Sequence, residues 1–582
     1  MAWLSDNALK VLATRYLRRD RDGIVTETPA ELFRRVAKAI AAAEISWGTN
    51  EDVARWEEKF YSVTSKLLFL PNSPTLMNAG TTANQLSACF VLPVDDDMSS
   101  IFTTLKNAAL IQQSGGGTGF NFSHLRPRND PAVRTGGIAA GSVAFMKVFD
   151  AATEHIKQGG IRRGANMGIL NIDHPEIEEF IFSKRVPGVL GNFNISVGIS
   201  DAFMNAMEQD TKWSLVHPNT KKTVRQLPAR QLWNDIIESA WRTGDPGMIF
   251  LDTINSANPT PALGKIESTN PCGEVPLLPY EPCNLGSVNL TKFIKQTTAG
   301  KEVDWKYLEE IIPIAIRFLD NVIEVNDYII PEIKGMALGN RKIGLGIMGW
   351  AELLIQLGIP YDSEDAIRLA GQLMQFIRQK SLEASAELAG QRGVFPNWEK
   401  SIYAPNTPVR NATRTSIAPT GTISIIADTS SSIEPLFALA FRRRHVLNDE
   451  TLYSINQPFI AYLEKQHLFS EKTLEQVMEE GTAESIKELP AEAKNIFKTA
   501  LEISPSWHLK HQLAFQEYTD NAVSKTINLP ESATIADVSD IYMNAWKNKA
   551  KGITIFRYNS RGKQVMWQGL KSGIKSCKVC IE

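Results

Sequence analysis

The segment Asn270-Pro271-Cys272-Gly273-Glu274 carries the most information in this chain of 582 residues. Proline before the cysteine and glycine after it predict a rigid turn with the sulfur at its tip. In an extended turn, side chains at every second position point to the same side, so Asn270, Cys272 and Glu274 can converge on one small molecule. Protease-type thiolates are usually activated by a histidine, and none stands near Cys272 in the sequence. The segment therefore indicates cysteine chemistry of another kind.

Cysteine is scarce in the chain, and each position matters individually. The other four cysteines are Cys89, Cys283, Cys577 and Cys580. Such a sparse, odd set is not typical of a secreted disulfide scaffold. The C-x-x-C pair near the chain end has no second pair with which to bind zinc, so it indicates a redox dithiol, and two neighbouring lysines favour its thiolates.

Composition excludes several classes of protein. The chain has 62 basic and 64 acidic side chains, and this balance argues against a non-specific nucleic-acid binder. No apolar run approaches the roughly 20 residues that a bilayer span needs, and the N-terminus does not resemble a signal peptide. We therefore expect a cytoplasmic protein that binds neither nucleic acid nor membrane.

Hydrophobic periodicity indicates a helical N-terminal lobe followed by an α/β region. Residues 4–18 and 29–43 carry amphipathic helical patterns, and short apolar runs alternate with helical stretches from Leu86 onward. A helix is expected to begin near Ser363 and to stop at Gly390.

Two later segments are predicted to lie outside the packed core. Residues 470–499 are rich in glutamate and lysine, which predicts a helical insertion that faces solvent. Residues 562–582 have little apolar periodicity, which predicts a mobile tail.

Four further motifs have two interpretations each. Gly115–Gly119 lacks the lysine of a phosphate loop and favours a tight backbone passage. Gly159–Asn166, with two adjacent arginines, is either a site for phosphate or a base edge, or a solvated turn. Ala418–Ser424 is either an anion site at a helix start or an ordinary cap. His508 and His511 favour a surface pair, and no metal site is expected.

Taken together, these motifs resemble the large catalytic chain of ribonucleotide reductases, most closely the class II (adenosylcobalamin-dependent) ribonucleoside-diphosphate reductases. Asn-Pro-Cys-Gly-Glu followed by Pro-Cys-Asn-Leu-Gly-Ser is highly specific for this family. The likeness covers nearly the whole chain and is carried by residues 7–12, 71–75, 114–122, 159–168, 269–290, 340–349, 418–437 and 552–561.

The resemblance implies an α/β fold. Its centre would be a ten-stranded α/β barrel of two antiparallel five-stranded halves, with a finger loop through the middle. We expect the helical N-terminal lobe at residues 1–85, without an ATP cone, and the barrel with its effector loops at 86–561. A flexible, redox-active tail would occupy residues 562–582.

The resemblance also implies catalytic roles. Cys272 would become a thiyl radical that removes the 3′-hydrogen of a ribonucleotide. Glu274 would take the proton of the 3′-hydroxyl, and Asn270 would orient the ribose. Cys89 and Cys283 would be the dithiol that supplies two electrons.

The tail would complete the electron route. By resemblance, Cys577 and Cys580 carry electrons inward by thiol exchange, with thioredoxin or glutaredoxin as the partner. A flexible linker of about fifteen residues can stretch to about 50 Å, which suits such a shuttle.

Three groups of binding residues follow from the same likeness. The substrate phosphates would meet Thr420, Gly421, Thr422, Ile423 and Ser424. Other substrate contacts would come from Ser73, Thr75, Ser87 and Ala88. A nucleoside or deoxynucleoside triphosphate effector would be read by Asp96, Arg126 and Arg162.

The radical source has two candidates. Residues 554–558 read Thr-Ile-Phe-Arg-Tyr and lack the tandem tyrosines of class I enzymes, so the resemblance implies adenosylcobalamin. The alternative is a class I-like catalytic subunit that receives its radical from a separate ferritin-like metal subunit. A homodimer is plausible, and the sequence leaves open whether diphosphates or triphosphates are reduced.

Overall fold

The computed structural model describes residues 4–132, 136–158, 162–298, 300–447, 450–484, 486–560 and 566–568. The N-terminal lobe is helical, as expected. Its helices are α1 (Asp6–Arg15), α2 (Pro29–Ala41), η1 (Ala42–Ser46), α3 (Asn50–Ser65) and α4 (Ser73–Asn78). Thr28 with Glu31, and Thr49 with Asp52, form capping boxes that fix the starts of α2 and α3.

The first half of the barrel contains five parallel strands. In spatial order they are β2 (Cys89–Val91), β3 (Gly117–Asn121), β8 (Asn166–Asn171), β9 (Phe193–Ile199) and β12 (Gly247–Phe250). Each strand is followed by a helical crossover, so the strands are buried on both faces and read as continuous apolar runs.

The second half is also parallel. It contains β15 (Pro282–Asn289), β18 (Ile343–Met348), residues 413–417, β21 (Thr526–Leu529) and β22 (Gly552–Arg557). The bridges Leu345↔Thr415 and Ile417↔Val523 join its middle strands. The halves meet through antiparallel pairs, β2 with β15 and β12 with β22, which close the barrel. The predicted ten-stranded architecture is confirmed.

The finger loop passes through the barrel centre. The short strands β13 (Ser268–Thr269) and β14 (Pro276–Leu277) pair and form its stem. A β-carbon at Gly119 would lie 1.7 Å from Thr269 O, and one at Gly117 would lie 2.8 Å from the Pro271 ring. These glycines therefore allow β3 to touch the finger, which agrees with a tight passage at Gly115–Gly119.

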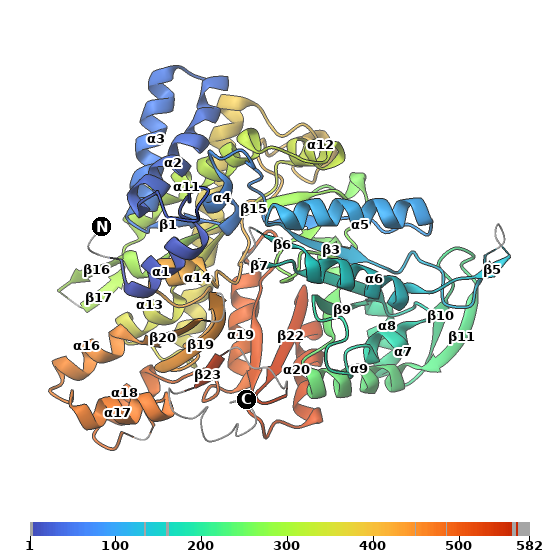
Figure 1. The fold of residues 1–582 in the computed structure, drawn as a ribbon. Helices are drawn as coiled ribbons and strands as arrows, with labels where there is room; N and C mark the ends of the chain where they lie inside the picture. Colours follow the sequence, from blue (N-terminus) through green and yellow to red (C-terminus); the bar gives the residue numbers. More distant parts are fainter. Residues whose placement is uncertain are drawn as a thin grey trace.

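Helices cover the outside of the barrel (Figure 1). The lobe packs over the second half, and the helices of residues 98–243 flank the first half on the other side of the picture. The long covering helices are α5 (Met98–Gln113), α6 (Ser142–His155), α9 (Ala229–Thr243), α11 (Trp305–Val325), α14 (Glu364–Arg392), α19 (Pro505–Gln516) and α20 (Ile535–Lys547). In the described residues, no helix is both long enough and apolar enough to span a bilayer.

Three local predictions need correction. Helix α14 begins after Ser363 as expected, but it continues through Gly390 and ends at Arg392, before Gly393 with its φ of 80°. The segment 470–499 is not simply solvent-facing, because Val477 and Phe497 bury their side chains in a small core of their own. The segment therefore packs through a few apolar side chains, although most of its residues are polar.

The histidine pair is buried instead of lying at the surface. His508 and His511 are both 0% exposed. Their ring nitrogens bond the carbonyls of Ala500 and Tyr361 at 3.0 and 2.8 Å, which satisfies them inside the core. Tertiary packing around α19 overrode the polar character of the two side chains.

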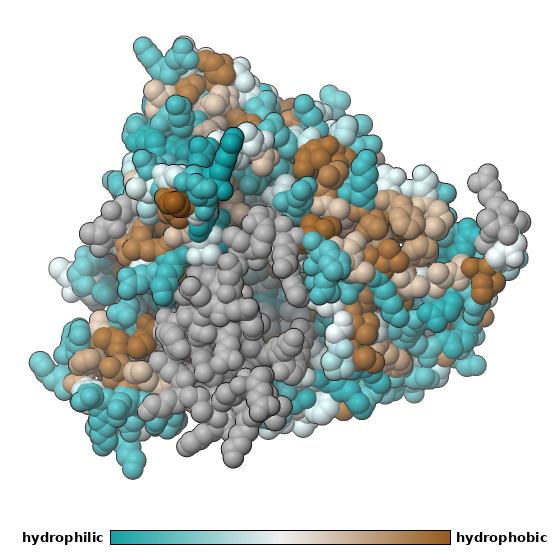
Figure 2. Space-filling model, in the orientation of Figure 1, coloured by the Kyte–Doolittle hydropathy of each residue, from teal (hydrophilic) through white to brown (hydrophobic). Residues whose placement is uncertain are grey.

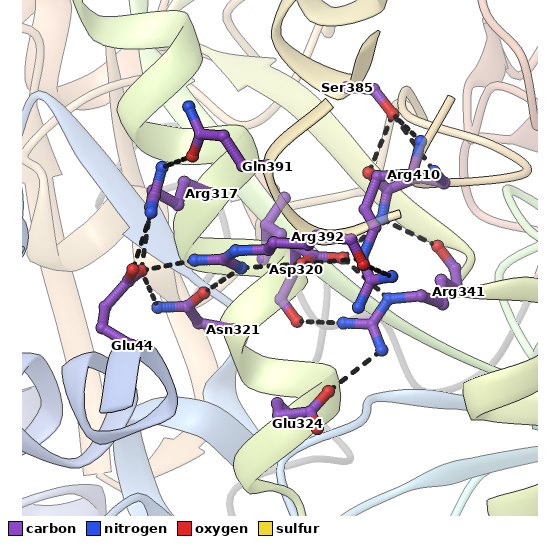
Figure 3. Close-up of polar contacts among 12 residues, drawn as sticks. Glu44, Arg317, Asp320, Asn321, Glu324, Arg341, Ser385, Gln391, Arg392 and Arg410 are labelled. Carbon is purple, nitrogen blue, oxygen red and sulfur yellow. Dashed lines mark hydrogen bonds and ion pairs between the residues drawn. The ribbon is translucent and has the colours of Figure 1, made fainter. Parts of the chain in front are cut away.

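A buried ion cluster fastens the lobe to the barrel (Figure 3). Arg392 bonds both Glu44 of the lobe and Asp320 of α11, at 2.7 and 2.9 Å. Arg341 adds a bond of 2.9 Å to Asp320. Burial alone would raise the pKa of Asp320, but Arg341, Arg410 and Arg392 hold it at about 2. We call these five residues the arginine cluster.

Candidate active site

The fingertip is held in one conformation by its own backbone and by β9. Asn270 N and Oδ1 pair with Val275 O and N at 3.2 and 3.0 Å, and Gly273 turns the chain with a φ of 82°. Asn194 of β9 donates to Pro271 O at 2.8 Å. Cys272 is thereby presented at the tip, where its side chain is exposed.

Cys272 lies where two cavities meet. The smaller cavity, of about 280 Å³, is also lined by Cys89, Asn270, Glu274 and the 420–423 loop. The larger cavity, of about 690 Å³, lies between the barrel and residues 424–458 and contains Cys272 in its wall. The sulfur can therefore contact one ligand on each side, and the sequence prediction that Asn270, Cys272 and Glu274 converge agrees with the lining of the smaller cavity.

Cys89 and Cys283 face each other across the seam between the two halves. They are direct partners in the antiparallel pair of β2 with β15, and both are free thiols. Directly opposed residues have Cα atoms about 4.5–5.5 Å apart, a separation that a disulfide can bridge. Burial, reinforced by the charge of Glu274, raises the pKa of the Cys89 thiol well above its ordinary value. The pair is therefore held as protonated thiols.

Glu274 is a buried carboxyl beside these sulfurs. Burial raises the pKa of Glu274 to about 7, although a hydrogen bond from Asn270 opposes the shift. Its Oε2 atom has no hydrogen-bond partner among the described residues. The backbone is fixed by Ser416 Oγ and Ala522 N, which both donate to Glu274 O at 2.9 Å. A carboxyl with this pKa can accept and return a proton near neutrality.

Asn270 also contacts the dithiol. Its Nδ2 donates to Cys89 Sγ at 3.2 Å. One side chain thus links the fingertip to the sulfur pair.

The loop from Thr420 to Ser424 forms one end of the smaller cavity. Helix α15 (Ile423–Ile426) starts within it, and no carbonyl among the described residues accepts from Thr422 N or Ile423 N. Two of the hydroxyls are used inside the protein: Thr420 Oγ1 accepts from Ser432 N at 2.8 Å, and Ser424 Oγ bonds Ser431 Oγ at 3.0 Å. The amides of Thr422 and Ile423 are thus the donors of this loop that could meet an anion.

The remaining predicted substrate residues divide into two groups. Ser73 and Ala88 line the smaller cavity. Thr75 and Ser87 lie in the packed interior instead, where Thr75 Oγ1 donates to Leu86 O and Ser87 N donates to Gln85 Oε1. The structure therefore brings two of the four to the cavity wall.

Of the predicted effector residues, Asp96 lies just before α5 and Arg126 follows β3. Asp96 accepts from Arg126 Nε at 2.7 Å and from Asn219 Nδ2 at 2.6 Å. Asn219 belongs to the turn between β10 (Lys212–Val216) and β11 (Thr223–Pro228). Arg162 lies in β7 (Arg162–Arg163), outside the residues whose side chains are described.

Sequence reasoning missed Arg15 and Asn219. Arg15 ends α1 and donates to Thr422 Oγ1 at 3.2 Å, so it brings a positive charge from the lobe to the 420–424 loop. Neither residue belongs to a motif, and only the fold brings each to its site. Cys577 and Cys580 lie outside the described residues.

This barrel with a cysteine at its fingertip defines a class of protein. Residues 87–556 match the model of the ribonucleotide reductase barrel domain, and residues 2–84 match that of the ribonucleotide reductase all-alpha domain. The chain therefore belongs to the ribonucleotide reductase family.

Two relatives are similar over almost the full chain. The vitamin B12-dependent ribonucleoside-diphosphate reductase of Thermoplasma acidophilum is 48% identical, over 97% of this chain and 80% of the relative. The protein of the same name from Mycobacterium tuberculosis (strain CDC 1551 / Oshkosh) is 49% identical over the same shares. A solved structure, the Actinobacillus ureae class Id ribonucleotide reductase alpha subunit, has the same fold: its TM-score is 0.78 at 24% identity, over 96% of this chain and 98% of that one.

Proposed function

We propose that this chain reduces ribonucleoside diphosphates to 2′-deoxyribonucleotides by thiyl-radical chemistry, with adenosylcobalamin as the radical source. The observation that carries the proposal is the position of Cys272 between two cavities, one of which it shares with Asn270, Glu274 and Cys89. The similarity to relatives named as vitamin B12-dependent ribonucleoside-diphosphate reductases supports the cofactor and the diphosphate substrate.

The smaller cavity would bind the substrate with its phosphates at the 420–424 loop. Amides of Thr422 and Ile423 and the guanidinium of Arg15 would hold the phosphates there. The ribose would then lie over Cys272 and Glu274, which line the same cavity. Ser73 would contact the sugar or the phosphates from the other wall.

Hydrogen removal would begin the reaction. Adenosylcobalamin, when bound, supplies the one-electron oxidising power that converts the Cys272 thiol into a thiyl radical. The Cys272 sulfur then takes the 3′-hydrogen atom, and Glu274 accepts the proton of the 3′-hydroxyl. Because the pKa of Glu274 is about 7, its carboxyl can take up and release a proton near neutral pH.

Loss of water and reduction would follow. The 2′-hydroxyl leaves as water after it accepts a proton, and two electrons enter the sugar from Cys89 and Cys283, which become a disulfide. Cys89 lines the cavity and is protonated, so it can give that proton. Cys272 finally returns the hydrogen atom to C3′, which restores the thiyl radical.

The larger cavity would hold the part of the cofactor that faces the fingertip cysteine. It has a volume of about 690 Å³ and opens directly on Cys272. Asn194 and Ser196 of β9, and Gln457 at the start of α16 (Gln457–Lys465), would meet hydrogen-bonding groups of the cofactor. Phe437 and Phe556 would contact its apolar surface.

The class I-like alternative is not favoured. Phe556 stands in the wall of the larger cavity, at the position where the family resemblance places tandem tyrosines in class I enzymes. Phenylalanine has no ionisable hydroxyl and cannot relay a proton-coupled oxidation from a separate subunit.

A nucleotide effector and a second copy of the chain complete the proposal. Asp96, Arg126 and Asn219 would bind the base of a deoxynucleoside or nucleoside triphosphate, with Arg162 signalling towards the substrate. Figure 2 shows apolar side chains gathered over α5 and α6. Exposed Met98, Phe102 and Val148 belong to these helices, and we propose that they pack against a second copy beside the effector site.

Reduction of the disulfide would use Cys577 and Cys580 as a shuttle to thioredoxin or glutaredoxin. The proposal includes a cytoplasmic location, because a thiol-dependent cycle needs a reducing compartment.

Replacement of Cys272 by serine tests the reaction. The C272S variant should form no deoxynucleotide, yet bind nucleotide with unchanged affinity, because the cavity keeps its shape. Retained turnover would falsify the radical assignment.

The cofactor is tested with purified wild-type chain, ribonucleoside diphosphate and a small dithiol. Product should require adenosylcobalamin and no second protein. Turnover that needs an added metal-containing subunit, and proceeds without adenosylcobalamin, would establish the class I-like alternative instead.

A further inference from the structure

A buried lysine lies beside the dithiol, and the mechanism above does not use it. Lys342 is 2% exposed, and its Nζ pairs with Glu281 Oε2 at 2.7 Å. Asn340 Nδ2 donates to the other oxygen of Glu281 at 2.6 Å. An ammonium group carries three donors, and Glu281 is the only partner of Lys342 Nζ found in the described part of the chain. The ammonium therefore has donors to spare.

The register of the sheet brings this lysine next to Cys283. Strands β15 and β18 are parallel, with Asn284 opposite Ile343, so one residue earlier Cys283 is opposite Lys342. Neighbouring strands lie about 4.8 Å apart. Glu281 and Cys283 are two residues apart and share a face, and Lys342 reaches that face because it pairs with Glu281.

The two sulfurs of the dithiol differ in their surroundings. Cys89 lines the smaller cavity, whereas Cys283 is absent from its lining. Burial raises the pKa of both thiols, but the charge of Lys342 opposes the rise only at Cys283. The negative charges of Glu281 and Glu274 raise the pKa of Cys283. At Cys89 the charge of Glu274 raises the pKa of the thiol, and no cation is among the groups that shift it.

We propose that Lys342 is a positioning residue that directs reductive cleavage of the Cys89–Cys283 disulfide, so that an incoming thiolate attacks Cys89 and Cys283 departs as a thiolate held by the ammonium of Lys342. The inference rests on the proposed function, which makes these two cysteines the redox pair.

The step balances with a dithiol as the reductant. The reductant thiolate forms a bond to Cys89 Sγ while the Cys89–Cys283 bond breaks, and the electron pair of that bond goes to Cys283 Sγ. The second thiol of the reductant then displaces Cys89, and the reductant leaves as a disulfide. Both protein sulfurs finish as thiols after taking one proton each, and the reductant supplies the two electrons. A stabilised leaving thiolate departs faster.

The rate of disulfide reduction tests the role of Lys342. The chain is oxidised by one turnover without reductant, mixed with dithiothreitol and quenched by alkylation at set times. The Lys342→Met variant should recover its Cys89 and Cys283 thiols about tenfold more slowly than wild type. The deoxynucleotide formed in a single turnover of pre-reduced chain should not change. An unchanged rate of reduction overturns the inference.

A matched control separates charge from packing. Lys551 is also buried, and its ammonium donates to Asp520 O at 2.8 Å without being a neighbour of Cys283. The Lys551→Met variant should reduce its disulfide at the wild-type rate. If Lys342→Met does not fold, the charge-neutral double variant Glu281→Gln/Lys342→Met replaces it. It should reduce its disulfide more slowly than wild type, though by less than Lys342→Met, because removal of the Glu281 charge offsets part of the loss. Equal slowing in Lys551→Met would also overturn the proposal.

The site of attack gives a second readout. When oxidised wild-type chain reacts with 2-mercaptoethanol alone, mass spectrometry should find the mixed disulfide on Cys89. The adduct should spread to Cys283 in Lys342→Met. An adduct mainly on Cys283 in wild type would refute the assigned direction. If wild type forms no Cys89–Cys283 disulfide on turnover, the proposed function fails instead, so the two failures are distinguishable.

Discussion

Glu274 and Asp320 are both fully buried carboxyls, yet their pKa values move in opposite directions. Burial raises the pKa of Glu274 to about 7, since no cation stands among the groups that perturb it. Asp320 experiences the same effect of burial, but three arginines reverse it and hold its pKa at about 2. Burial alone favours the neutral acid, and the partners decide the outcome.

This difference separates reactivity from stability. The fingertip carboxyl is left without a compensating cation, so it can exchange a proton with a ligand near neutral pH. The arginine cluster keeps Asp320 charged at every physiological pH and ties α11 to Arg392 and, through it, to Glu44 of the lobe. We therefore expect substitutions in the two regions to affect different measurements.

The largest effect is expected on activity at Glu274. The Glu274→Gln variant keeps the shape of the side chain but removes the base, so turnover should fall by about 10²- to 10⁴-fold. Its free energy of unfolding at pH 7 should not fall, because the substitution removes an unpaired buried acid. Initial rates and urea denaturation measure the two quantities. If Glu274→Gln lost as much free energy of unfolding as an Asp320 variant, the proposed contrast between a reactive and a stabilising carboxyl would be wrong.

The second effect is expected on stability at Asp320. The Asp320→Asn variant leaves Arg341, Arg392 and Arg410 without their shared carboxylate, which should lower the free energy of unfolding by about 3–5 kcal/mol. Urea denaturation gives this value. Turnover per folded molecule should stay near that of wild type, since Asp320 does not line either cavity.

The pH dependence of stability should have opposite signs in the two regions. The raised pKa of Glu274 gives stability below about pH 4.5 that is lost as the pH rises through about 7, a difference of about 3 kcal/mol. The lowered pKa of Asp320 gives stability above about pH 4 that is lost as the pH falls through about 2. Urea unfolding from pH 4 to 8 should therefore show Glu274→Gln gaining on wild type with rising pH. Parallel curves would contradict the Glu274 assignment.

The smallest effect is expected at an exposed ion pair. Lys510 and Glu364 lie 2.6 Å apart with side chains 46% and 71% exposed. The Lys510→Ala variant should change the free energy of unfolding by less than about 0.5 kcal/mol. It serves as the control for Asp320→Asn. If Lys510→Ala lowered the free energy of unfolding by as much as Asp320→Asn, burial could not explain the contribution of the arginine cluster to stability.

Local patterns predicted much of the fold and of the site. The proline and glycine beside Cys272 predicted a turn, and Ser363 predicted the start of a helix. The family motifs predicted the barrel and the finger loop. Patterns failed where packing overrode local character. Helix α14 continued through Gly390, since one glycine costs only about 1 kcal/mol in a helix, and His508 found its hydrogen-bond partner inside the core.

The sequence by itself determined the chemistry available to this protein: a cysteine in a rigid turn, an acid and an amide beside it, and few other thiols. Only the tertiary structure decided which groups meet. Closure of the barrel set Cys89 opposite Cys283, brought Arg15 to Thr422, and shifted the pKa values of Glu274 and Asp320 in opposite directions. The reason is physical. Sequence patterns report preferences over a few neighbouring residues, whereas burial and electrostatic field depend on groups that only the folded chain brings together.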